Sequence, residues 1–67
     1  MEFVAIQNFA EEINKENGLN LNFVVKSNFL ETTYVLKNGE DVLKEHYDLQ
    51  VLFAFLQGIK FMSKVTH

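Results

Sequence analysis

The sequence predicts an α+β fold of the order α-β-β-β-α, a three-stranded antiparallel meander with two helices packed on one face. Three observations support this fold. Apolar residues recur at helical spacing near both ends of the chain, apolar and polar residues alternate in the middle, and Asn38-Gly39 separates two alternating runs. With 67 residues, the chain is expected to form a single domain, 1–67, with a small core.

The first helix is predicted over residues 3–16. Apolar residues at three- and four-residue spacings fall on one side of this helix, and polar residues fall mostly on the other. The apolar set is Phe3, Ile6, Phe9, Ala10 and Ile13. Asn17-Gly18 follows where helices commonly end in a left-handed residue, so we expect Gly18 to terminate the helix.

Three strands are predicted in the middle of the chain. From Leu19 to Lys26 the period changes from helical to two, which is typical of a strand with one buried face. After a connection that begins at Ser27-Asn28, a second strand is expected over residues 31–37. Asn38-Gly39 then predicts a two-residue type I′ loop that leads into the third strand.

A two-residue loop would determine the register of the second and third strands. The expected pairs are Lys37 with Glu40, Val35 with Val42, Tyr34 with Leu43 and Thr33 with Lys44. The expected core face carries Tyr34, Leu36, Leu43 and Tyr47. The expected outer face carries Val35, Val42, Lys37, Lys44 and His46. Two carboxylates, Asp41 and Glu45, would fall on the core face, so we expect them near the edge or the ends of the sheet.

The last helix is predicted from Leu49 to about Lys64, with Asp48 as its N-cap. One apolar stripe of this helix would cover the sheet and the first helix. That stripe consists of Leu52, Phe55, Ile59 and Met62, flanked by Val51 and Leu56.

The last helix also carries apolar side chains that the stripe does not use. Phe53 and Phe61 point away from the stripe by helical geometry, and exposed apolar patches on small proteins usually mark interfaces. We therefore predict that Phe53, Phe61 and Val51 form an interface with a partner protein or with a second copy. The alternative is that the first helix covers Phe53, while Phe61 folds back onto a frayed end.

The outer face of the sheet is the second candidate surface. Its residues are Val24, Val35, Val42, Lys26, Lys37 and Lys44. This face is suited to an acidic partner or to sheet-on-sheet dimerisation, and the alternative is an ordinary solvated face. No aromatic residue is expected there, which disfavours the stacking of nucleic-acid bases.

No catalytic, cofactor-binding or metal-binding site is predicted. The chain has no Cys, its three Gly are isolated, and no Ser or Thr has an evident base partner. His46 lies near Glu45 and Asp48, but successive strand residues point to opposite faces and do not converge on a metal ion. The second histidine, His67, is the last residue. We expect a protein that is not an enzyme.

Hydropathy and charge indicate where the protein acts and what it binds. No apolar run approaches the roughly 20 residues that span a bilayer, and no signal-peptide pattern is present, so we expect a soluble cytoplasmic protein. The net charge is -3, all six basic residues are Lys, and Arg is absent. Because Arg makes bidentate contacts with phosphate and guanine, its absence counts against nucleic-acid recognition.

The predicted order of elements resembles the double-stranded RNA-binding domain over nearly the whole chain. That family grips RNA through polar residues of its first helix, a Gly-Pro-x-His-type loop and a Lys-rich start of its last helix. Here the loop reads KSNFLE, the last helix starts DLQVLFAF, and three glutamates make the first helix acidic, Glu11, Glu12 and Glu16. The resemblance therefore extends to the fold and not to RNA binding.

In size, acidity and element order the chain is also similar to small acidic proteins of bacteriophages and mobile elements, such as the type II anti-CRISPR inhibitors. This resemblance implies inhibition of a host nucleic-acid enzyme by binding to it. We therefore expect a non-enzymatic protein-binding module whose partner is a host enzyme. The alternatives are a small homo-oligomeric structural protein, for example a homodimer, that associates through its last helix, and a weak nucleic-acid-binding accessory protein.

Binding to duplex RNA or duplex DNA should be negligible at physiological salt, because the chain has six Lys, no Arg and an acidic first helix. A fluorescence titration with each duplex measures this. Tight binding that weakens steeply with added salt would instead favour the nucleic-acid-binding alternative.

Overall fold

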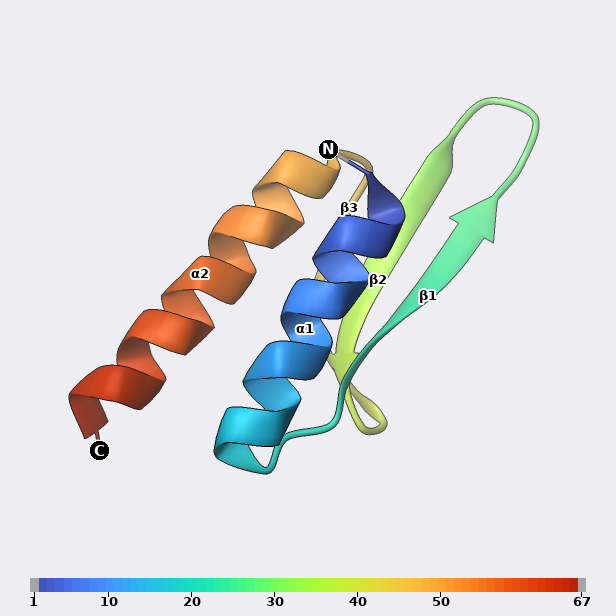
Figure 1. The fold of residues 1–67 in the computed structure, drawn as a ribbon. Coiled ribbons are helices and arrows are strands. Elements are labelled where there is room, and N and C mark those ends of the chain that lie inside the picture. Colours follow the sequence, from blue (N-terminus) through green and yellow to red (C-terminus); the bar gives the residue numbers. More distant parts are fainter. Residues whose placement is uncertain (1, 67) are drawn as a thin grey trace.

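The computed structural model describes residues 2–66, with side chains up to residue 64. The elements are α1 (Phe3–Asn17), β1 (Leu21–Ser27), β2 (Thr32–Asn38), β3 (Asp41–His46) and α2 (Leu49–Thr66). The strands form one antiparallel sheet in the order β1-β2-β3, and the two helices lie side by side on one face of it (Figure 1). The predicted fold class is confirmed, and its element order agrees with that of the double-stranded RNA-binding domain.

The end of α1 and the start of α2 are at the predicted capping residues. Gly18 adopts a left-handed φ of 65°, and its N–H donates to the carbonyl of Asn14 at 2.8 Å, which ends α1. A glycine adopts this conformation at little cost because it has no Cβ. At the start of α2, Asp48 Oδ1 accepts a hydrogen bond from the N–H of Gln50 at 2.9 Å, as an N-cap does.

The core lies between the two helices and the sheet. Its buried residues are Ile6, Ala10, Ile13, Leu21, Leu36, Leu52 and Leu56. Aromatic rings extend this core toward one end of the molecule, where Phe3 packs edge-on against Phe23 and tilted against Tyr34, with ring centroids 5.6 and 5.2 Å apart. Each fully buried aliphatic side chain contributes roughly 1.5–3 kcal/mol of transfer free energy, so this small set supplies much of the stability.

An asparagine side chain connects α1 to the sheet. Asn14 Oδ1 accepts a hydrogen bond from the N–H of Leu21 at 2.7 Å, and its Nδ2 donates to the carbonyl of Leu21 at 3.0 Å. In an antiparallel strand these two groups of one residue point to the same side. The amide of Asn14 therefore takes the place of a neighbouring strand at the start of β1.

The hairpin between β2 and β3 differs from the prediction. Its closing pair is Asn38 with Asp41, so the loop is Gly39-Glu40, and the predicted pairs from Lys37–Glu40 onward are wrong. Gly39 has a φ of 62° while Glu40 does not have positive φ, which is the pattern of a type II′ turn rather than type I′. Asn38 stays in the ladder because its Oδ1 accepts a hydrogen bond from the N–H of Asn20 at 3.0 Å.

A β-bulge shifts the remainder of β3 by one residue. Before the bulge Val42 pairs with Lys37 on the outer face, but after it Lys44 pairs with Leu36, which is a core residue. A shift of one residue moves every following side chain to the other face of the sheet. The predicted outer-face positions of Lys44 and His46 are therefore wrong.

The bulge also keeps a carboxylate from lying beneath the helices. Glu45, predicted on the core face, lies on the outer face opposite Val35 and forms an ion pair with Lys26, with 3.7 Å between Nζ and Oε1. The same shift brings Lys44 to the helix side, opposite Leu36, where its side chain stays exposed. The predicted core residues Leu43 and Tyr47 are exposed, so that part of the prediction is also wrong.

Gly39→Val should lower the denaturation midpoint, because a β-branched residue resists positive φ at a cost of about 1–3 kcal/mol. Urea denaturation followed by circular dichroism measures the change. Gly58→Ala is the control, since this helical glycine has nothing within 4 Å of an added Cβ, and Ala should hold or raise the midpoint. Equal midpoints for wild type and Gly39→Val would contradict the assigned turn.

Candidate protein-binding surfaces

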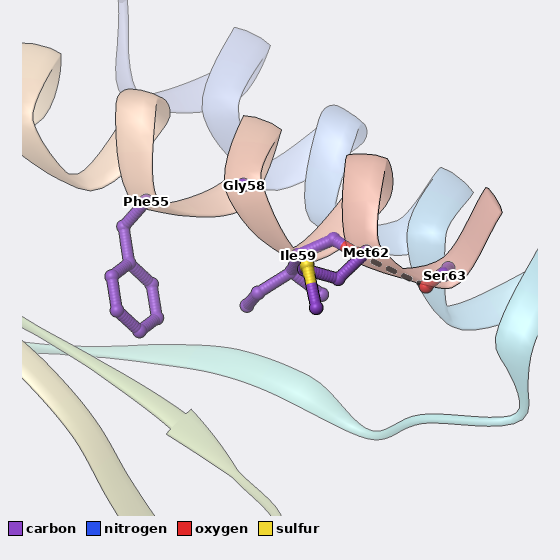
Figure 2. Close-up of a pocket in the computed structure, with 5 residues that line it drawn as sticks. All are labelled: Phe55, Gly58, Ile59, Met62 and Ser63. Atoms are coloured by element: carbon purple, nitrogen blue, oxygen red, sulfur yellow. Dashed lines mark hydrogen bonds between the residues drawn. The ribbon is translucent and has the colours of Figure 1, made fainter. Parts of the chain in front are cut away.

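An open groove of about 540 Å³ lies along α2. Its lining residues all come from this helix and are Phe55, Gly58, Ile59, Met62 and Ser63. Figure 2 shows the side chains of Phe55, Ile59 and Met62 extending from α2 on the side where the strands run. Ser63 Oγ donates to the carbonyl of Ile59 at 3.0 Å within the helix. The surface that the groove offers to a ligand is therefore mainly apolar.

Helical spacing explains how the sequence forms this groove. Leu52 and Leu56 are fully buried and face the core. Val51, Phe55 and Gly58 follow one another at four- and three-residue steps along the neighbouring flank of α2. Gly58 contributes no side chain, and an added Cβ there would meet nothing within 4 Å. The glycine thus widens the groove at its middle.

The other flank of α2 packs against α1. Phe53 is partly buried, with its ring centroid 5.0 Å from that of Phe9 in α1. Lys60 Nζ lies 5.4 Å from the centroid of the same Phe9 ring and 3.4 Å from Glu12 Oε1. This flank is therefore occupied within the molecule.

The three residues predicted as an interface do not share one surface. Val51 lies on the groove side of α2, whereas Phe53 is covered by α1, as the alternative reading of the sequence anticipated. Phe61 is 65% exposed and lies about 180° around the helix from Leu52, away from the core. Met62, predicted as part of the core stripe, is 58% exposed, so that prediction is wrong.

The predicted second surface, on the outer face of the sheet, is only partly assembled. Val24 and Val42 are exposed there, but Val35 in the central strand is buried. Lys26 is paired with a carboxylate, and the bulge has moved Lys44 to the side of the helices. The face is therefore not the basic platform that three lysines would have made.

A second exposed apolar feature, which the sequence analysis did not predict, is the loop between β1 and β2. Phe29 is fully exposed and Leu30 nearly so. Asn28 Oδ1 accepts hydrogen bonds from the N–H groups of Leu30 at 2.8 Å and Glu31 at 3.1 Å, so this turn has a defined shape. Figure 1 shows the loop at the far end of the hairpin, beyond the helices. The available signal was two adjacent apolar residues inside a polar turn, where strand alternation had already ended.

The titratable residues near the end of β3 form local contacts. His46 Nδ1 accepts a hydrogen bond from the N–H of Asp48 at 2.9 Å, and its ring stacks on Tyr47 with centroids 4.5 Å apart. Among residues 2–66, no group of three His, Cys, Asp or Glu side chains could hold a metal ion. His67 lies outside the described residues. Within the same range, neither helix has the length and apolarity needed to cross a membrane.

Comparison of the chain with family models, curated proteins and solved structures finds no match in any of the three. The resemblance to the double-stranded RNA-binding domain therefore consists of the element order alone. The groove along α2 and the other exposed surfaces are therefore the features of this chain that bear on its function.

Phe53→Ser and Phe61→Ser should have different effects on stability. Phe53 packs against Phe9 and the core, so its truncation should cost on the order of 2 kcal/mol or more. Phe61 is largely exposed, so its replacement should change the free energy of unfolding by no more than about 0.5 kcal/mol. Thermal unfolding of the two single variants compares them directly. A larger loss for Phe61→Ser would mean that α2 is rotated relative to the packing described here.

Proposed function

We propose that this protein is a non-enzymatic, cytoplasmic protein-binding module that contacts its partner through the groove along α2. The observation that supports the proposal is that α2 leaves an open groove lined by Phe55, Ile59 and Met62 on so small a protein. Exposed apolar patches usually mark interaction sites, and aromatic residues and Met are enriched at interfaces. The partly buried Phe55 is the anchor for a partner side chain.

The partner is a host nucleic-acid enzyme, as the resemblance to small acidic phage proteins implies. Enzymes of this kind carry basic surfaces that bind phosphate groups. A net charge of -3 favours the approach of an acidic module to such a surface. The module inhibits by covering that surface, and it needs no chemistry of its own.

A homodimer that associates through the last helix is the second candidate. The observation that favours it is Phe61, which is largely exposed on the side of α2 opposite the core. Because Phe61 is 65% exposed, its burial against a second copy removes less than the roughly 150–250 Å² that complete burial of an aromatic side chain removes from water. That area alone is small compared with the roughly 800 Å² per partner of a stable interface.

Affinity capture from a bacterial lysate tests the proposal with two matched variants. Gly58→Gln fills the groove, and because the position is open and Gln favours helix over Gly, the fold is retained. Ala5→Gln places the same side chain on the exposed face of α1. We expect wild type and Ala5→Gln to capture the same protein and Gly58→Gln to lose it. Circular dichroism verifies that all three are folded.

Two outcomes of the capture experiment would contradict the proposal or favour the second candidate. Capture of one protein by all three variants, or by none of them, contradicts binding through the α2 groove. Light scattering on the wild-type protein alone gives its mass, and a dimer that Phe61→Ser converts to monomer would favour the second candidate.

A further inference from the structure

The widths of the two layers do not match. A helix with its side chains is about 10–12 Å across, so two neighbouring helices are about as wide as four or five strands spaced roughly 4.8 Å apart. The sheet has three strands. Because α1 packs on β1 and α2 packs on β3, each helix extends past its edge strand by about the width of one strand. Figure 1 shows α2 on the side of α1 away from β1.

The part of each helix that extends past its edge strand has different surroundings at the two edges of the sheet. At the β1 edge, Asn14 occupies both backbone hydrogen-bonding groups of Leu21, and the depression beside them includes the polar residues Gln7 and Glu11. On the other side of the molecule α2 packs on β3, and the flank of α2 away from α1 is the apolar groove that contains Phe55. In the part of the chain that the structure describes, β3 has a neighbouring strand on one side only. An open strand edge beside an apolar groove is suited to accept a further strand.

Charge indicates which strand this edge accepts. Residues 40–48 contain one lysine and four acidic residues, so they carry a formal charge of -3, which is the net charge of the whole chain. The acidic residues are all exposed and are Glu40, Asp41, Glu45 and Asp48. Pairing β3 with β3 of a second copy would bring two such segments together, which like charges oppose. A segment with Lys or Arg side chains is attracted instead.

We infer that β3 accepts an extended, basic segment of the partner protein as a fourth strand of the sheet. The backbone of this segment pairs with the free edge of β3, and its alternate apolar side chains enter the groove beside Phe55 and Ile59. Its Lys or Arg side chains are attracted by the exposed carboxylates of residues 40–48. The inference rests on the proposed function, because it specifies how a partner fills the α2 groove. About six residues match β3, which has six.

Selection from a displayed library of random linear peptides tests this inference without knowledge of the partner. We expect the enriched peptides to alternate apolar residues with Lys or Arg. A synthetic copy of an enriched peptide should bind at least tenfold more weakly to Gly58→Gln, and its binding should weaken with added salt. Hydrogen exchange should show new protection of β3 amides when this peptide is bound.

Charge-neutralised variants provide a matched control. Glu40→Gln with Asp41→Asn should weaken binding of the enriched peptide, whereas Glu11→Gln with Glu16→Gln, which makes the same charge change on exposed positions of α1, should not. Equal weakening by both pairs would contradict a site at β3.

Several outcomes overturn the inference. Enriched peptides that are acidic, that show helical spacing of apolar residues, or that leave β3 exchange unchanged would each do so, and so would the absence of enrichment. A dimer whose β3 amides are protected would show that the edge binds a second copy. If Gly58→Gln still abolishes capture of a partner protein in any of these cases, the proposed function stands and only the added-strand mode fails. If Gly58→Gln captures the partner protein as well as wild type does, the proposed function fails as well.

Discussion

Two helices are held on a three-stranded sheet by a small group of aliphatic side chains, and a chain of 67 residues without Cys has no disulfide to support this contact. Leu36 lies in the central strand and is fully buried, with Leu52 and Leu56 of α2 buried in the same cluster. Because a sheet of this width cannot cover both helices, the outer flank of each helix meets either polar groups or solvent. The open side of α2 is a direct consequence of this packing.

Polar side chains occupy backbone groups at the start of the first strand. Asn14 uses both of its amide groups on Leu21, so the start of β1 is occupied by α1. Asn20 and Asn38 connect the segment before β1 to the tip of the second hairpin, and Gly39 also donates its N–H to the carbonyl of Asn20 at 2.9 Å. The Asn14 bonds satisfy backbone groups of Leu21 that would otherwise be open to another strand. Among the described strands, β3 has a neighbour on one side only.

The exposed apolar side chains are distributed over distinct surfaces, and they differ in how they could serve binding. Phe29 and Leu30 project from a turn held by Asn28, so they resemble an anchor that enters a pocket of another molecule. Phe55 and Ile59 line a groove, so they receive a side chain instead. The groove lies on the helix that packs on β3, an edge strand whose segment 40–48 carries concentrated negative charge, so it indicates the chemistry of its partner more specifically.

Local patterns in the sequence were sufficient to predict the two helices, their capping residues Gly18 and Asp48, and the three strands, since these depend on residues close together in the chain. Tertiary structure alone decided the register of β3, because the bond between the Asn38 side chain and Asn20 joins segments that are distant in the chain. The candidate site likewise depended partly on local sequence patterns and partly on tertiary structure. Helical spacing identified α2 as the helix with surplus apolar residues, but the position of α1 determined that Phe53 is covered and that the flank with Phe55 stays open.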